Sequence, residues 1–165
     1  MAQVAETSIG FGFDIHRLGD ANKPLVVVGM RIPNATSGPI AHSDGDSAIH
    51  ALIDSILGSI AEGDIGAHFP DSDPKYKNIS SVFLLKETLR IFYRRGGHIQ
   101  HIDMTVILDE PPLVKFRDHF RGYLAALCGL PKERISIKFK HTNGAYAMPV
   151  YAAQCAVLVS IMKER

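Results

Sequence analysis

The sequence predicts an α/β (α+β) two-layer sandwich, in which helices pack on a mixed sheet. Two patterns indicate this fold: segments that alternate between apolar and polar residues, typical of strands, are followed by segments with apolar residues three and four positions apart, typical of helices. The 165 residues suit one domain, and no repeat or linker divides them. We therefore expect a single domain over 1–165, with 1–7 as a loose N-terminus.

The first elements are predicted to be two strands and a loop. Residues 8–16 alternate and form a strand with four large apolar residues on one face, namely Ile9, Phe11, Phe13 and Ile15. Residues 25–28 are a short apolar run that predicts a second strand. Pro, Asn, Ser and Gly within 33–38 are typical of a loop.

Two helices follow, with a polar segment between them. Residues 46–61 carry the apolar stripe of a helix, and Ser43 or Asp44 can cap its start. Residues 62–78 are rich in Asp, Gly and Pro, which breaks regular structure. A second helix is predicted over 81–95.

The remaining segments continue the alternation of strands and helices. Residues 99–108 predict a long strand, and a third helix is expected to open at Pro112 and close at Gly129. Residues 135–139 alternate like a strand. The segment 151–162 is small and apolar, which fits a helix or a strand, and we expect a helix.

Charge and composition exclude several classes of protein. The 18 basic and 17 acidic side chains give a net charge of +1, which argues against a strongly basic nucleic-acid binder and against a disordered chain. No apolar run approaches the ~18 residues of a spanning helix, and no secretory signal is visible. We expect no nucleic-acid or membrane partner, and a place in the bacterial cytoplasm, or in the plastid stroma if a transit peptide was removed.

Cysteine and histidine usage points toward metal or phosphate chemistry. Cys128 and Cys155 are too few for a disulfide framework or a four-thiolate zinc site, and we expect them to be buried, inert thiols in helices. The 8 histidines lie beside Asp-rich stretches, a combination typical of metal or phosphate sites.

Asp14 and His16 form the first candidate pair. Residues at i and i+2 of a strand point to the same face, so both side chains can reach one metal ion. Surface polar residues at a strand end are the alternative interpretation.

The second candidate cluster surrounds the start of the first helix. Asp46, His50 and Asp54 are spaced i, i+4, i+8 and form one row about 90° from the centre of the apolar stripe, where a metal ligand can have a carboxylate neighbour. His42 and Ser43 precede them. An ordinary exposed helix face is the alternative.

The third cluster runs from Gly63 to Gly66 and continues from His68 to Pro74. Its dense Asp, Gly and Pro suit a loop that wraps a polar ligand, or a simple surface turn. Together the clusters offer Asp14, His16 and His50 as ligands of a tetrahedral zinc with one open position. Such a zinc can polarise a phosphoryl oxygen.

Four sequence blocks resemble the 2-C-methyl-D-erythritol 2,4-cyclodiphosphate synthase family. They read G-F-D-x-H, R-I-P, A-H-S-D-G-D-x-x-x-H-A-L-x-D and G-D-I-G-x-x-F-P-D-x-D-P, and they occupy Gly12–His16, Arg31–Pro33, Ala41–Asp54 and Gly63–Pro74. Their order and spacing make the resemblance specific. The C-terminal half is similar mainly in its pattern of elements.

The resemblance implies a homotrimer of α/β subunits with active sites at the subunit interfaces. It implies conversion of 4-diphosphocytidyl-2-C-methyl-D-erythritol 2-phosphate into the 2,4-cyclodiphosphate and CMP, a step of the non-mevalonate isoprenoid pathway. One Zn²⁺ per subunit, held by Asp14, His16 and His50, and a second ion, Mg²⁺ or Mn²⁺, are implied as cofactors.

The resemblance also assigns roles to other residues. It implies catalytic roles for His42, Asp64 and Thr142. It implies substrate binding by His42, Ser43, Asp64, Ile65, Gly66, Asp71, Asp73 and Lys77, and nucleotide binding by Asp109, Glu110, Pro111, Lys140 and Thr142.

The chain departs from the family pattern on the nucleotide side. Of the family's T-T-E motif only Thr142 remains, and Asn143 replaces the acid that holds the second metal, which predicts a weaker Mg²⁺ site. Pro112 replaces a family lysine, and the family's later Arg and Glu have no counterpart in 144–151. Two alternatives therefore stand beside the enzyme: a zinc-bearing homologue that no longer cyclises and serves binding or assembly, and a general metal phosphohydrolase.

Overall fold

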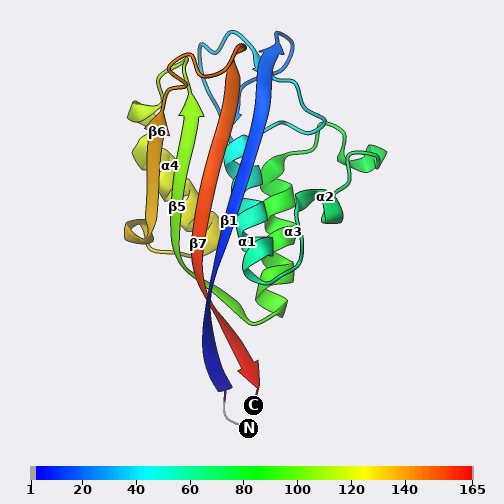
Figure 1. Cartoon of the computed structure of the whole chain (residues 1–165), viewed down its shortest axis with the longest axis vertical. Coiled ribbons are helices and arrows are strands. Elements are labelled where there is room, and N and C mark those ends of the chain that lie inside the picture. The colour runs from blue at the N-terminus through cyan, green and yellow to red at the C-terminus, as the bar shows by residue number, and fades with distance from the viewer. Residues whose placement is uncertain (1–2, 165) are drawn as a thin grey trace.

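A five-stranded mixed sheet organises the chain, which we describe over residues 3–164 of a computed structural model. The strand order is β4-β1-β7-β5-β6 (Figure 1). Only β5 and β6 run parallel; the other neighbours are antiparallel. The strands are β1 Gln3–Asp20, β4 Gly38–Pro39, β5 Gly97–Leu108, β6 Ile135–Lys140 and β7 Val150–Glu164, and a separate small pair is β2 Val26–Val27 with β3 Met30–Arg31.

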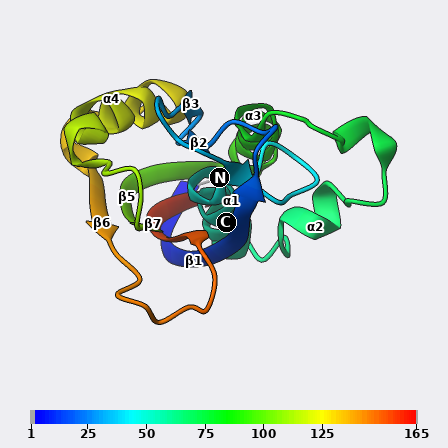
Figure 2. The ribbon, with the colours of Figure 1, turned by 90° about the horizontal axis from the view of Figure 1, so that it is seen from above.

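Helices cover one face of this sheet, as Figures 1 and 2 show. Helix α1 packs directly on β1 and β7, with α3 beside it, and α4 covers β6. The helices are α1 Ser47–Ser59, α2 Ile65–His68, α3 Ser81–Arg94 and α4 Arg117–Cys128, and the short 3-10 turns are η1 Pro74–Tyr76, η2 Val114–Phe116 and η3 Lys132–Arg134. The predicted mixed sheet packed by helices is confirmed.

Two glycines allow α1 to lie against β1. A Cβ atom at Gly10 would fall 1.8 Å from the backbone oxygen of Ser55, and one at Gly12 would fall 2.0 Å from that of Ala51. Any side chain at either position would collide with the helix backbone, so only glycine permits this approach. The helix is correspondingly buried along almost its whole length.

The apolar residues of β1 face away from the helices. Ile9 is 76% exposed and Phe11 is 65% exposed, and Phe13 and Ile15 extend the same row. On β7, Leu158 adds to this outer surface. The core instead lies between the other face of the sheet and the helices. The alternating pattern therefore predicts the strand correctly, but its large apolar residues lie on the face that no helix covers.

The last segment is a strand, so the prediction of a helix over 151–162 is wrong. β7 pairs with both β1 and β5 in the middle of the sheet. Its inward residues Val157 and Val159 are buried, while the outward Ala156 and Leu158 are also apolar. Because both faces are apolar, the two-residue period of a strand is hidden in the sequence.

Several boundaries also need correction. Residues 3–7 of the expected loose N-terminus belong to β1, which pairs with β7 there, while residues 1–2 lie outside the described part of the chain. The third helix starts at Arg117, after the η2 turn, instead of at Pro112, and ends as predicted with a left-handed Gly129. The polar segment 62–78 contains the short α2 and η1. Cys155 lies in β7, although it and Cys128 are buried as expected.

Among residues 3–164, no helix has the length and apolar character needed to cross a membrane.

Replacing Gly12 with Ala is expected to destabilise the fold, because its Cβ would overlap the backbone of α1. The strain and displacement should cost about 3 kcal/mol of unfolding free energy, measured by urea unfolding. Gly122→Ala in α4 is the matched control: apart from its own helix, nothing in residues 3–164 lies within 4 Å of the place a Cβ would take, and Ala should raise stability by about 0.5–1 kcal/mol. A Gly12→Ala protein as stable as wild type would contradict this packing.

Candidate metal centre and substrate cavity

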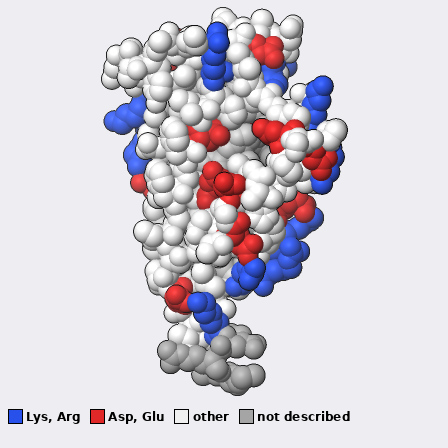
Figure 3. Space-filling view, turned by 45° about the vertical axis from the view of Figure 1, so that its right-hand side comes forward, with Lys and Arg blue, Asp and Glu red and all other residues white. Residues whose placement is uncertain are grey.

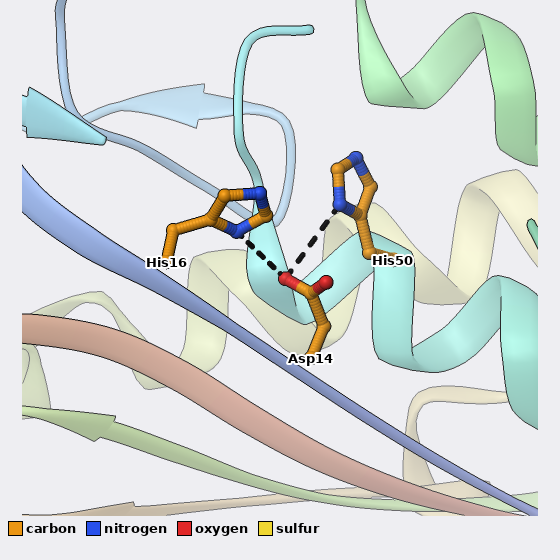
Figure 4. Close-up of side chains that lie close together, drawn as sticks. All are labelled: Asp14, His16 and His50. Atoms are coloured by element: carbon orange, nitrogen blue, oxygen red, sulfur yellow. Dashed lines mark ion pairs between the residues drawn. The ribbon is translucent and has the colours of Figure 1, made fainter. Parts of the chain in front are cut away.

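The close approach of β1 and α1 brings three potential metal ligands together. Asp14 and His16 lie on β1 and His50 lies near the start of α1. Asp14 Oδ2 is 2.8 Å from Nδ1 of His16 and 3.6 Å from Nδ1 of His50, and the three side chains point toward one another (Figure 4). One ligand atom from each lies within 4.8 Å of the others. The predicted gathering of these residues is confirmed.

The donor set fits a zinc ion. Asp14 Oδ2 is buried and accepts no hydrogen bond of good geometry within residues 3–164, as expected for an atom that coordinates a cation. Two imidazole nitrogens and one carboxylate oxygen are a common set for zinc with one open coordination position. The residues present therefore suit the metal that the family resemblance implies.

Charge interactions within the cluster favour opposite charges on its members. Burial alone would raise the pKa of Asp14, but its contacts with His16 and His50 outweigh burial and hold that pKa well below its usual range. Burial alone would lower the pKa of His50, but its contact with Asp14 and the charges of Asp46 and Asp44 together outweigh burial and raise that pKa. The cluster thus keeps a charged carboxylate at its centre.

The two acids in line with His50 have structural tasks instead of contacting its ring. Asp46 caps α1, so the prediction of Ser43 or Asp44 as the cap is wrong. Its buried carboxylate accepts hydrogen bonds from the Val28 and Gly29 amides and from the Tyr151 hydroxyl at 2.8 Å. Asp54 accepts the amide of Ile65 at 2.8 Å and so holds the start of α2.

A cavity of about 310 Å³ opens beside the ligand cluster. Besides the three ligands, five residues that the sequence assigned to substrate or catalysis line it: His42, Ser43, Ile65, Gly66 and Asp71. Its apolar wall, which the sequence did not predict, comes from Phe69, Tyr76, Ile79 and Leu84. Acidic groups gather in the middle of the molecular face shown in Figure 3, and basic groups lie around its edges.

Lys23 positions the loop that carries two of the lining residues. Its Nζ donates to the backbone oxygens of Ala41 and Ser43, both at 2.6 Å. These bonds fix the loop around His42, whose Nε2 is buried with no hydrogen-bond partner within residues 3–164. A lone lysine 18 positions from Ala41 gives no sequence signal for this role.

Three predicted substrate residues lie outside this cavity. Asp64 caps α2 through the amide of Ala67, at 2.9 Å, and Asp73 caps η1 and pairs with Lys75 at 2.8 Å. Lys77 does not line the cavity either. Asp and Pro in this loop therefore shape the turns that carry Ile65, Gly66 and Asp71.

Four of the five residues predicted for the nucleotide line a second cavity of about 700 Å³. Asp109, Glu110, Pro111 and Thr142 line it, but Lys140 does not. Thr142 donates its amide and its hydroxyl to Asp109, at 2.7 and 2.6 Å, and these bonds lower the pKa of Asp109. Thr142 is therefore absent from the cavity around His50, and its hydroxyl hydrogen is already engaged.

A sequence model described as the YgbB family matches residues 7–160. The chain belongs to the YgbB family. A relative in Syntrophotalea carbinolica, named 2-C-methyl-D-erythritol 2,4-cyclodiphosphate synthase, is 44% identical over 135 residues, which cover 82% of this chain and 81% of that protein. The synthase of Brachyspira hyodysenteriae is 46% identical over 132 residues, which cover 80% and 82%. The family resemblance read from the sequence is confirmed.

Other relatives are longer. A bifunctional enzyme IspD/IspF of Bradyrhizobium diazoefficiens is 39% identical over 137 residues, which cover 83% of this chain but 34% of that enzyme. The chain thus spans about a third of the bifunctional relative and about four fifths of the single-function ones.

Solved structures agree with the family assignment. A structure of 2C-methyl-D-erythritol-2,4-cyclodiphosphate synthase has a TM-score of 0.85 at 39% identity, covering 92% of this chain and 99% of that one. The bifunctional IspDF from Campylobacter jejuni has a TM-score of 0.88 at 34% identity, covering 96% of this chain and 43% of that one. The fold around the metal centre is therefore shared.

Replacing Asp46 with Ala should loosen the start of α1. Removal of a helix cap together with a buried hydrogen-bond acceptor should cost about 2–4 kcal/mol of unfolding free energy, measured by chemical denaturation. Asp73→Ala, which removes the partly exposed cap of the short η1 turn, is the control and should leave the unfolding midpoint unchanged. Equal stability of the two variants would show that Asp46 does not anchor α1.

Proposed function

We propose that this chain converts 4-diphosphocytidyl-2-C-methyl-D-erythritol 2-phosphate into 2-C-methyl-D-erythritol 2,4-cyclodiphosphate with release of CMP. The observation that carries the proposal is the Asp14, His16 and His50 cluster at the edge of a cavity in a member of the YgbB family. Two relatives, 44% and 46% identical to the chain over the aligned residues, are named for the cyclic product.

Zinc would be held by Asp14, His16 and His50, and when bound it supplies a Lewis acid for a phosphoryl oxygen. In this proposal His42 and Ser43 bind the substrate's phosphates at the same cavity, and Ile65, Gly66 and Asp71 line the methylerythritol pocket. The apolar wall around Phe69 excludes water from the reacting groups.

The chain's residues act by holding one substrate at both ends. The substrate's 2-phosphate oxygen forms the new bond to the β-phosphorus, and the bond to CMP breaks. Orientation within one molecule can supply about 7–11 kcal/mol of the barrier at best. A protein nucleophile is unnecessary, which agrees with the state of the cysteines: burial raises the pKa of Cys128 and of Cys155 to about 12.

We further propose a homotrimer with its active sites between subunits. Within one chain, Thr142 and the nucleotide-side residues line a different cavity from the metal cluster, so each active site would take one cavity from each of two subunits. The exposed apolar row of β1 supplies a surface for assembly. Asn143 at the second-metal position makes a bound Mg²⁺ or Mn²⁺ weaker than in the family pattern.

His50→Ala should abolish CMP release from the cytidyl substrate in the presence of Zn²⁺ and Mg²⁺. Loss of one of three metal ligands should lower the rate by about 10³-fold or more, as measured by chromatography of CMP and the cyclic product. His119→Ala removes an exposed histidine on α4 and serves as the control. Wild-type turnover no faster than that of His50→Ala would favour the non-cyclising homologue. Hydrolysis of simple phosphoesters without ring closure would favour the phosphohydrolase.

Phe11→Arg should dissociate the trimer, because it places a charge in the middle of the exposed apolar row. Analytical ultracentrifugation should show a trimer for wild type and a monomer for this variant, which should bind zinc but release no CMP. Phe83→Arg changes an exposed phenylalanine on α3 and should remain trimeric. A monomeric wild type with full activity would contradict the shared site.

A further inference from the structure

We propose that Ser81 and Asp44 are positioning residues for the metal centre: together they fix the hydrogen of His50 on Nε2, so that Nδ1 is the nitrogen offered to the cation. This inference rests on the proposed zinc site. The sequence offered Asp44 only as a possible cap of the first helix, and it did not indicate Ser81 at all, because Ser81 is 31 positions from His50 in the chain.

The hydrogen bonds around Ser81 leave its hydroxyl one role toward His50. Ser81 Oγ donates to a carboxylate oxygen of Asp44, which as an acceptor has no hydrogen to give. The same Oγ lies 2.8 Å from His50 Nε2. A hydroxyl has one hydrogen, so with that hydrogen on Asp44 it can only accept from the ring, and Nε2 must carry the hydrogen.

The opposite side of the ring faces the metal cluster. His50 Nδ1 is directed at Asp14 Oδ2, 3.6 Å away (Figure 4). With Nε2 occupied, Nδ1 provides the lone pair. A hydrogen bond at the far nitrogen is the general means by which proteins set the tautomer and orientation of a ligating histidine.

Burial and backbone contacts make this arrangement rigid. Ser81 is 0% exposed and is the first residue of α3. Asp44 also accepts the amide of Ser81 at 2.9 Å, so one carboxylate holds both the backbone and the hydroxyl. Ser43 Oγ lies farther from His50 Nε2, at 3.3 Å, and accepts the amide of Gly45. Ser81 is therefore the principal partner of the ring.

The first test measures zinc affinity by competition with a chromophoric chelator. Ser81→Ala should bind Zn²⁺ about 10–100-fold more weakly than wild type, the usual effect of losing such a partner. Ser59→Ala is the matched control, since it removes another buried serine, whose hydroxyl donates to the Ile56 carbonyl of its own helix, and its zinc affinity should be unchanged. Circular dichroism verifies that each variant is folded.

Asp44→Asn tests whether the carboxylate acts through Ser81. It should also weaken zinc binding, and the double variant Asp44→Asn/Ser81→Ala should bind no more weakly than Ser81→Ala alone. Additive losses in the double variant would contradict a relay. Zinc affinity of Ser81→Ala equal to that of wild type would overturn the proposal.

A second readout is made on the wild-type protein itself. Long-range ¹H–¹⁵N NMR of metal-free wild-type protein at mildly alkaline pH reports which nitrogen of His50 carries hydrogen, with the signal assigned by its loss in His50→Gln. The proposal expects Nε2; hydrogen on Nδ1 would overturn it. If wild type shows the expected tautomer but binds no zinc, the proposed function fails and the positioning by Ser81 stands.

Discussion

The contact between the backbones of β1 and α1 is the constraint on which the candidate metal centre depends. Gly10 and Gly12 let the helix approach until no Cβ would fit between them. Asp14 and His16 continue the same face of the strand, so they meet the first turns of the helix, where His50 lies. Larger residues at the two glycines would separate the strand from the helix and move the ligands apart.

Two further sets of hydrogen bonds stabilise the start of α1 and the ring of His50. Asp46 ties the helix cap to Tyr151 in the central strand. Asp44 and Ser81 link His50 to the start of α3.

The net charge of the chain is only +1, and acids predominate in the middle of the face in Figure 3. A substrate with several phosphates would therefore depend on bound cations instead of a basic protein surface.

Sequence patterns predict the parts of this site that depend on local periodicity. Asp14 and His16 follow from the two-residue period of a strand, and His50 from its row on a helix. The roles of Lys23 and Ser81 cannot be predicted from local sequence patterns, because they depend on contacts between segments that are distant in the chain. The sequence of β7 suggests a helix because the outward face of this strand is also apolar, which removes the polar half of a strand's alternation.

The central claim is that Asp14, His16 and His50 form one zinc site. Anomalous diffraction from crystals of the purified protein, recorded on both sides of the zinc absorption edge, tests it directly. The account predicts one anomalous peak per subunit at about 2.0–2.2 Å from a carboxylate oxygen of Asp14 and from one nitrogen of each histidine. A zinc-saturated protein with no peak there, or with its peak at other residues, would contradict the account.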